Sequence, residues 1–151
     1  MCTEKELAFS TFIFYSLSET WNTTPAEVYR VLNTTHILDG YIIEAYDVLH
    51  TLGREYLIED ISELVGENKM SSIVHKADDK DRVLGFYKRE LEDSIILNIA
   101  KVKNIGIRKA MDMYYSSSVA MKIAEMKDLP GNMDVNKLVR DVIRRKAELE
   151  R

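Results

Sequence analysis

The sequence predicts an all-α protein of about seven helices, arranged as two small modules joined by a polar linker. Only two prolines and six glycines occur in 151 residues, so long stretches lack the residues that break helices. Apolar residues recur at helical spacing along most of the chain. Apolar residues make up 46% of the chain and charged residues 30%, which is typical of a folded globular protein. A chain of this length buries roughly 68–70% of its unfolded surface, enough for a core.

The first two helices are predicted from apolar spacing and from a capping motif. Residues 3–20 are apolar on more than one side, which predicts a helix buried on two sides. The segment "TTPAEVYRVL" contains the clearest helix start in the sequence. Thr24 can cap the helix, Pro25 fits its first turn, and Glu27 completes the Ser/Thr-x-x-Glu capping box.

Two further helices complete the first module, residues 1–65. Asp39 is the expected cap of a helix that runs to His50, and the last helix carries apolar residues at helical spacing. Between them, "HTLGRE" predicts a tight connection, because Gly53 tolerates positive φ and Thr51 can accept a hydrogen bond from an uncapped amide. The apolar positions of the last helix are Leu57, Ile61, Leu64 and Val65.

A polar segment separates this module from the second, residues 82–151. Residues 66–81 lose helical periodicity and collect charges of both signs. They are predicted to form a linker, or a short strand-like loop around Ile73 and Val74.

Three helices are predicted in the second module. A long first helix continues to about Lys103 and is broken at Gly106, and a second covers residues 108–126. The segment "DLPGNMD" is a loop with Pro-Gly at its centre. Asn132 or Asp134 then caps the last helix.

Charge is distributed unevenly between the two halves. Residues 1–65 hold three basic and eleven acidic residues, a net charge of −8, whereas residues 66–151 hold eighteen basic and fourteen acidic residues, a net charge of +4. The acidic half would attract a basic partner and repel nucleic acid. The lone Cys2 indicates no disulfide, and the first residues carry neither a signal peptide nor an apolar run long enough to cross a membrane. We therefore expect a cytoplasmic protein without membrane contact.

The sequence contains no motif that predicts catalysis, a cofactor or a metal. It has no phosphate-binding glycine loop, no Cys-x-x-Cys pair and no His-Glu-x-x-His. The three histidines share no metal-ligand spacing. The serines at 116–118 have no nearby histidine and no nucleophile-elbow glycines. We expect a non-enzymatic protein without cofactor or metal. Carboxylate pairs such as Glu44 with Asp47 are expected to be solvated on polar helix faces.

The stretch "DGYIIEAYDVLHTLGREYLIEDI" resembles a family of short bacterial domains of unknown function. The resemblance covers residues 5 to about 65 and rests on a Tyr-x-x-Leu-His-Thr-x-Gly core followed by Tyr-Leu-x-Glu-Asp-Ile. These positions are Tyr46, Leu49, His50, Thr51, Gly53, Tyr56, Leu57, Glu59, Asp60 and Ile61.

Residues 85–127 are similar to a companion family of unknown function, with the pattern Ala-x-x-x-Tyr-x-Ser. The end of the chain departs from that family, because "LPGNMDVNKLVRDVIRRK" lacks an aromatic-rich finish. Both families are found beside genes that resemble ADP-ribosyltransferase toxins. The resemblance therefore implies an antitoxin or companion role.

These observations favour a protein that binds a toxin-like enzyme, with aromatic side chains as anchors and complementary charge. They leave open a homo-oligomer. The alternative is DNA binding by a helix-turn-helix around Gly106, although that segment offers few side chains suited to base edges. The candidate partner-binding residues are Tyr46, His50, Thr51, Gly53, Arg54, Tyr56, Asp60, Tyr114, Tyr115 and Ser116.

Overall fold

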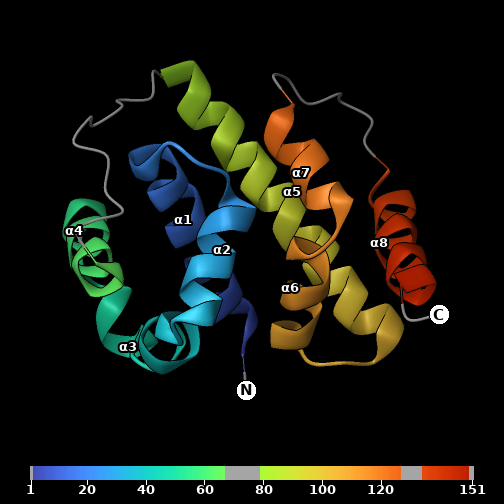
Figure 1. Cartoon of the computed structure of the whole chain (residues 1–151), viewed down its shortest axis with the longest axis horizontal. Helices are drawn as coiled ribbons and strands as arrows, with labels where there is room; N and C mark the ends of the chain where they lie inside the picture. The colour runs from blue at the N-terminus through green and yellow to red at the C-terminus, as the bar shows by residue number, and fades with distance from the viewer. Residues whose placement is uncertain (1, 67–78, 127–133, 150–151) are drawn as a thin grey trace. The chain divides into compact units, whose positions relative to one another are not determined.

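The computed structural model describes residues 2–66, 79–126 and 134–149, and every regular element in these ranges is helical (Figure 1). The all-α prediction is confirmed. Residues 8–78 form one compact unit, and residues 1–7 with 79–151 form another. The predicted linker lies mostly outside the described residues, as does most of the "DLPGNMD" loop. The elements are α1 Glu4–Trp21, α2 Pro25–Thr34, the π-helix η1 Leu38–Ile43, α3 Tyr46–Leu49, α4 Arg54–Val65, α5 Asp79–Lys103, α6 Ile107–Tyr115, α7 Ser118–Glu125 and α8 Val135–Leu149.

Local capping chemistry fixes several helix starts. The Thr24 hydroxyl accepts a hydrogen bond from the Glu27 amide at 3.2 Å, as predicted for α2. Asp134 accepts one from the Lys137 amide at 3.2 Å and so caps α8. The sequence reasoning missed a third cap. At α1 the Thr3 amide donates to Glu6 at 2.9 Å, and the Glu6 amide donates to the Thr3 hydroxyl at 3.2 Å, which is a reciprocal capping box.

The predicted helix from Asp39 to His50 is wrong. The chain forms the π-helix η1 and then the single turn α3, with a break at Ala45. Asp39 lies inside η1 and does not cap it. The two fully buried residues of η1 are Leu38 and Ile42, four positions apart. Apolar spacing of this kind suits an α-helix equally well, so periodicity alone could not reveal the wider π-helical turn.

The predicted single helix over residues 108–126 is also wrong, because it divides into α6 and α7 at Ser116 and Ser117. The Ser117 hydroxyl donates to the Tyr114 carbonyl at 2.6 Å, and the Ser117 amide donates to the same oxygen at 3.0 Å. Serine side chains compete in this way for backbone groups and favour helix ends. With both divisions, the described residues contain nine helical elements instead of about seven.

The helix α5 was predicted to be broken at Gly106, but the residue that terminates it is Asn104. Gly106 is extended, with φ −68° and ψ 156°, and is the N-cap of α6. The left-handed residue is Asn104, with φ +54°. The Ile105 amide donates to the Ala100 carbonyl at 3.0 Å, and the Asn104 amide to the Lys101 carbonyl at 3.4 Å. This is the hydrogen-bond pattern of a Schellman motif.

We expect Asn104→Ala to lower the free energy of unfolding by about 1 kcal/mol, because a Cβ-bearing residue without a local polar side chain is strained at positive φ. Urea unfolding would measure the change. Asn104→Gly is the matched control and should keep the wild-type stability within about 0.5 kcal/mol. An equal loss in both variants would contradict the conformational explanation.

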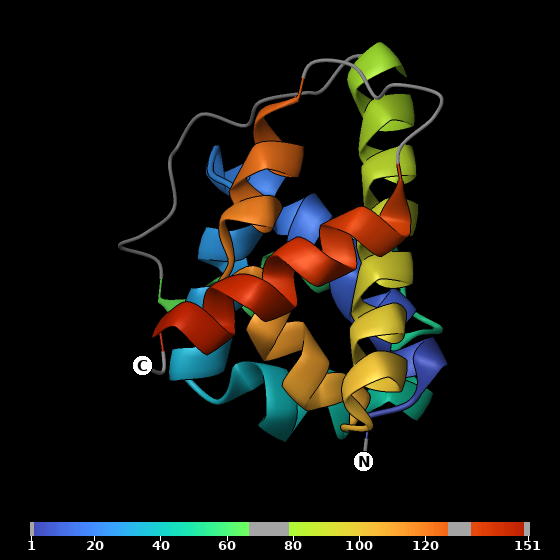
Figure 2. The ribbon, with the colours of Figure 1, turned by 90° about the vertical axis from the view of Figure 1, so that its right-hand side faces the viewer.

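Within the unit that contains residues 79–151, α6 and α7 follow one another alongside α5, and α8 runs obliquely across these helices (Figure 2). Each of these four helices contributes fully or almost fully buried side chains, among them Ile95, Ile96, Ile99, Met111, Tyr114, Val119, Ile123, Val139 and Val142. In the unit of residues 8–78 they come from α1, α2, η1, α3 and α4: Ile13, Phe14, Leu17, Val28, Leu32, Leu38, Ile42, Leu49, Leu57 and Ile61. Leu64, predicted to share the apolar stripe of α4, is 53% exposed.

Candidate functional site

The corner between α3 and α4 holds most of the candidate residues of the first unit. The His50 ring stacks on the Tyr46 ring, with centroids 4.5 Å apart and an interplanar angle of 14°. Its Nδ1 lies 2.7 Å from the Tyr46 carbonyl oxygen. Because a carbonyl only accepts, Nδ1 carries the proton, and in the neutral ring Nε2 is left as an acceptor. The half-buried Tyr46 ring also meets Phe9 edge-on at 5.5 Å. The His50 ring is therefore exposed, but its orientation is held by the contact with Tyr46 and by the hydrogen bond of Nδ1.

Two expectations about the α3–α4 connection are wrong. Gly53 has φ −71° and ψ 153°, an extended conformation open to other residues, and it is the N-cap of α4. The Thr51 hydroxyl donates to the Val48 carbonyl at 2.7 Å instead of accepting from an amide. Both residues are exposed. The turn is closed by hydrogen bonds from Thr51 and Leu52 to the carbonyls of Val48 and Leu49. These carbonyls stand at the end of α3, where a helix leaves its last carbonyls without partners of its own.

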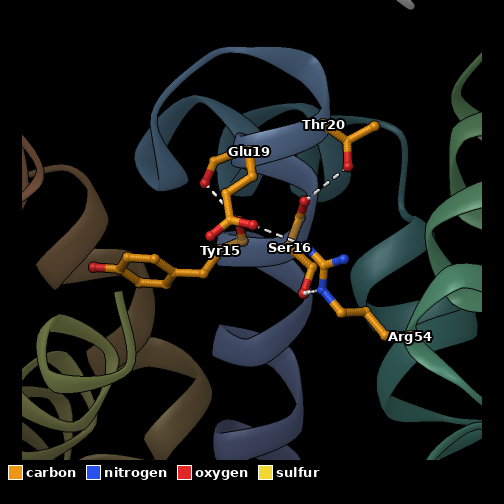
Figure 3. Close-up of polar contacts among 6 residues, drawn as sticks. Tyr15, Ser16, Glu19, Thr20 and Arg54 are labelled. Atoms are coloured by element: carbon orange, nitrogen blue, oxygen red, sulfur yellow. Dashed lines mark hydrogen bonds and ion pairs between the residues drawn. The ribbon is translucent and has the colours of Figure 1, made fainter. Parts of the chain in front are cut away.

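Arg54, in the first turn of α4, binds to α1 (Figure 3). Its Nε–H donates to the Ser16 hydroxyl at 3.2 Å, and its Nη2 donates to Glu19 Oε2 at 2.9 Å. Farther along the same two helices, Trp21 Nε1–H donates to the Ser62 hydroxyl at 3.0 Å. Arg54 thus joins α4 to α1, and its charge is already paired within the unit.

Asp60, another candidate, is half-buried and accepts a hydrogen bond from the Tyr41 hydroxyl. This hydrogen bond, with smaller contributions from burial and from the negative charge of Asp60, raises the pKa of Tyr41 from 10.0 to about 12. The charge of Tyr56 makes the smallest contribution to this shift.

The raised pKa of Tyr41 predicts a pH dependence of stability. The unfolded tyrosine loses its proton near pH 10 while the folded one keeps it to about pH 12. The stabilisation by the hydrogen bond is therefore complete below pH 10 and is lost as the pH rises from 10 to about 12. Ultraviolet titration of the phenolates should show one fewer late-ionising tyrosine in Tyr41→Phe than in the wild type. An identical titration of the variant at high pH would contradict this assignment.

Three large apolar side chains at this corner face water: Val48 is 64% exposed, Leu52 37% and Tyr56 57%. We call these three residues the corner surface. Sequence reasoning selected Tyr56 but missed the other two. Val48 falls outside the helical spacing of Ile42, Tyr46 and Leu49, and Leu52 lies in a polar connection. These irregular positions were the available signal, since an apolar residue outside the buried stripe has no core to enter.

The corner surface is bordered by acidic residues. Residues 44–63 contain six acidic residues and one arginine, a net charge of −5. The exposed carboxylates are Glu44, Asp47, Glu55, Glu59 and Glu63. The site therefore combines exposed apolar area with strong negative potential.

The candidates of the second unit have a different setting. Tyr114 is fully buried and Tyr115 is 7% exposed, and the two rings meet edge-on at 5.0 Å. The Tyr115 hydroxyl donates to the buried Glu92 carboxylate at 2.9 Å. Only Ser116 among these three is exposed. Both tyrosines belong to the core and offer no surface for a partner.

In the segment predicted to form a helix-turn-helix, most residues of the second helix, α6, are buried. In α6, five of nine residues are buried, whereas Lys109 and Asp112 are exposed and Arg108 is half-buried. One exposed lysine beside one exposed aspartate gives little positive potential for phosphates.

Within ranges 2–66, 79–126 and 134–149, no three His, Cys, Asp or Glu side chains gather closely enough to hold a metal ion. Among the helices in the same ranges, none has the length and hydropathy needed to cross a membrane.

Comparison with known families bears on the unit that holds the corner surface. Residues 8–68 match a family described as "Protein of unknown function (DUF3791)". This match confirms that the first half of the chain resembles a domain family of unknown function. The DUF3791 match includes η1, α3 and α4 and hence the whole corner surface. The chain matches no curated protein and no solved structure. The companion family expected for residues 85–127 stays a prediction.

Proposed function

We propose that this chain is a non-enzymatic cytoplasmic protein that binds a protein partner through the corner surface. The observation that carries the proposal is the exposure of Val48, Leu52 and Tyr56 within nine consecutive residues. Exposed apolar residues scattered singly are ordinary, but a group of them bordered by polar residues is typical of an interaction site. Tyrosine is also among the residues that contribute most to binding energy at protein interfaces.

The resemblance of the first half to domains found beside ADP-ribosyltransferase-like toxin genes supports a partner of that class. In this proposal the chain is the antitoxin or companion of such an enzyme. The neighbouring Tyr46, His50 and Thr51 would add a stacked ring and polar groups at the edge of the contact. Arg54 supports the site indirectly, since it joins α4 to α1.

The test is co-expression of the full chain with the product of the adjacent reading frame, followed by affinity capture and calorimetry. We expect Tyr56→Ala to weaken the complex about tenfold or more, because truncation of a central aromatic anchor costs roughly 1–2 kcal/mol or more. Val48→Asp should weaken it similarly, because it replaces exposed apolar area with charge.

Tyr87→Ala is the matched control. Tyr87 is 56% exposed, almost the same as Tyr56, but lies in α5. Its replacement should leave capture unchanged. Equal affinity of wild type and Tyr56→Ala for the partner would contradict the proposal, and so would the absence of any complex. A salt-dependent mobility shift with upstream DNA, abolished by Lys109→Ala, would favour the DNA-binding alternative.

A further inference from the structure

We infer that the corner surface receives a basic amphipathic segment of its partner, which places an apolar side chain on Val48 and Leu52 and an arginine or lysine side chain over Tyr56. This inference rests on the proposed function and names the chemistry of the partner. It follows from the local backbone, from the outer face of α4 and from the ion pairs of the two arginines in residues 8–66.

The backbone holds the three apolar side chains in neighbouring turns. The Thr51 amide donates to the Val48 carbonyl at 3.2 Å, and the Leu52 amide donates to the Leu49 carbonyl at 3.0 Å. The Leu57 amide then donates to the Gly53 carbonyl at 3.1 Å, which begins α4. The corner surface therefore lies on three successive hydrogen-bonded turns, short enough for one bound segment to cover.

The outer face of α4 places Tyr56 among carboxylates. Glu59, Asp60 and Glu63 follow Tyr56 by three, four and seven positions, so all four residues share one face of the helix. The opposite face carries the buried Leu57 and Ile61. A cation above an exposed tyrosine ring is attracted by the ring face and by nearby carboxylates together.

The hydroxyl of Tyr41 orients Asp60 on this face by its hydrogen bond to Oδ2. That bond leaves Oδ1 to accept from an incoming ammonium or guanidinium group. A carboxylate held in place by a neighbouring hydroxyl loses less conformational freedom when it binds, which strengthens the contact.

Both arginines of the described part of this unit, residues 8–66, form ion pairs. In residues 8–66 the basic side chains are Arg30 and Arg54. Arg30 is ion-paired with Glu27, and Arg54 with Glu19 at 2.9 Å. Neither pairing involves the carboxylates of residues 44–63. A partner that brings positive charge together with apolar area is therefore complementary to this surface, whereas an acidic segment or a nucleic acid would be repelled.

A peptide titration tests the inference directly. The probe is a 15-residue peptide of leucine and arginine at helical spacing, added to the ¹⁵N-labelled full chain. One matched peptide carries glutamate in place of arginine, and another carries serine in place of leucine. We expect amide shifts concentrated in residues 44–63, and at least tenfold weaker binding of both matched peptides.

Charge reversal on the protein gives the second readout. Glu59→Lys should weaken binding of the arginine peptide about tenfold. Glu90→Lys is the control, because Glu90 is exposed but lies in α5, and it should leave binding of the peptide unchanged. The inference is overturned if the arginine peptide does not bind at low salt, if the glutamate peptide binds equally well, or if the shifts lie outside residues 44–63. Loss of partner capture in Tyr56→Ala without binding of the basic peptide would retain the proposed function and overturn only this inference. Peptide binding at the corner with unchanged capture by Tyr56→Ala would instead remove the proposed function.

Discussion

Tyr114→Ala is expected to lower the free energy of unfolding by about 3–5 kcal/mol, the range for truncation of a large buried aromatic side chain. Tyr114 is fully buried, and its ring packs edge-on against Tyr115 at 5.0 Å. Its removal loses both the transfer free energy of the ring and the contacts of the atoms that surrounded it. Urea unfolding followed by circular dichroism measures the loss.

Ser116→Ala is the control for this prediction, because the neighbouring Ser116 is exposed. It should change stability by no more than about 0.5 kcal/mol, as is usual for surface substitutions. The comparison also decides the role of Tyr114. A Tyr114→Ala variant of unchanged stability but weakened partner capture would show that Tyr114 acts at an interface and that its burial has no energetic importance.

Phe14→Ala is expected to have an effect of the same size, about 3–5 kcal/mol, in the unit that holds the corner surface. The Phe14 side chain is fully buried, and its ring meets Tyr29 edge-on at 5.8 Å with an interplanar angle of 86°. Such ring pairs add roughly 0.5–1.5 kcal/mol beyond the burial of area. Thermal unfolding should show a correspondingly lower midpoint.

Phe86→Ala provides a control with the same chemical change at an exposed position. Phe86 is 47% exposed, and the Arg89 guanidinium lies 5.4 Å from its ring centroid. Since exposed cation–π contacts are worth roughly 0.5–1 kcal/mol, the loss should stay below about 1 kcal/mol. Equal losses for Phe14→Ala and Phe86→Ala would contradict the assignment of Phe14 to the core.

Together these variants separate residues that maintain the fold from residues that bind a partner. Tyr56 and Tyr114 are the same residue type, and both were candidates for binding. Tyr56 is 57% exposed and Tyr114 is fully buried. We therefore expect Tyr56→Ala to change affinity with little loss of stability, and Tyr114→Ala to do the reverse.

The helical content of the chain could be predicted because its signals are local. Thr24 and Asp134 cap helices through amides three residues away, and those motifs can be read directly from the sequence. The long α5 was predicted from apolar periodicity with few breakers. Residues 39–50 and 108–126 were each predicted as one continuous helix, but each is divided in the structure. Apolar spacing does not reveal a π-helical turn, nor a serine hydroxyl that donates a hydrogen bond to a backbone carbonyl.

The candidate site could be predicted only in part. The segment around His50 and Tyr56 was selected from its composition and its resemblance to a domain family, and the structure places exposed apolar residues there. The roles of Arg54 and Asp60 could not be predicted. Their partners, Glu19 and Tyr41, lie 35 and 19 residues away, and no spacing rule connects them.

The sequence by itself determined the all-α class, the capped helix starts and the negative charge of the first half, because each depends on residue type and short spacing. Only the tertiary structure decided which tyrosines meet water, where the helices divide, and that Arg54 is paired within its own unit. Exposure and pairing depend on side chains that folding brings together from distant positions. For that reason the corner surface, with Val48 and Leu52 beside Tyr56, became visible only in the folded chain.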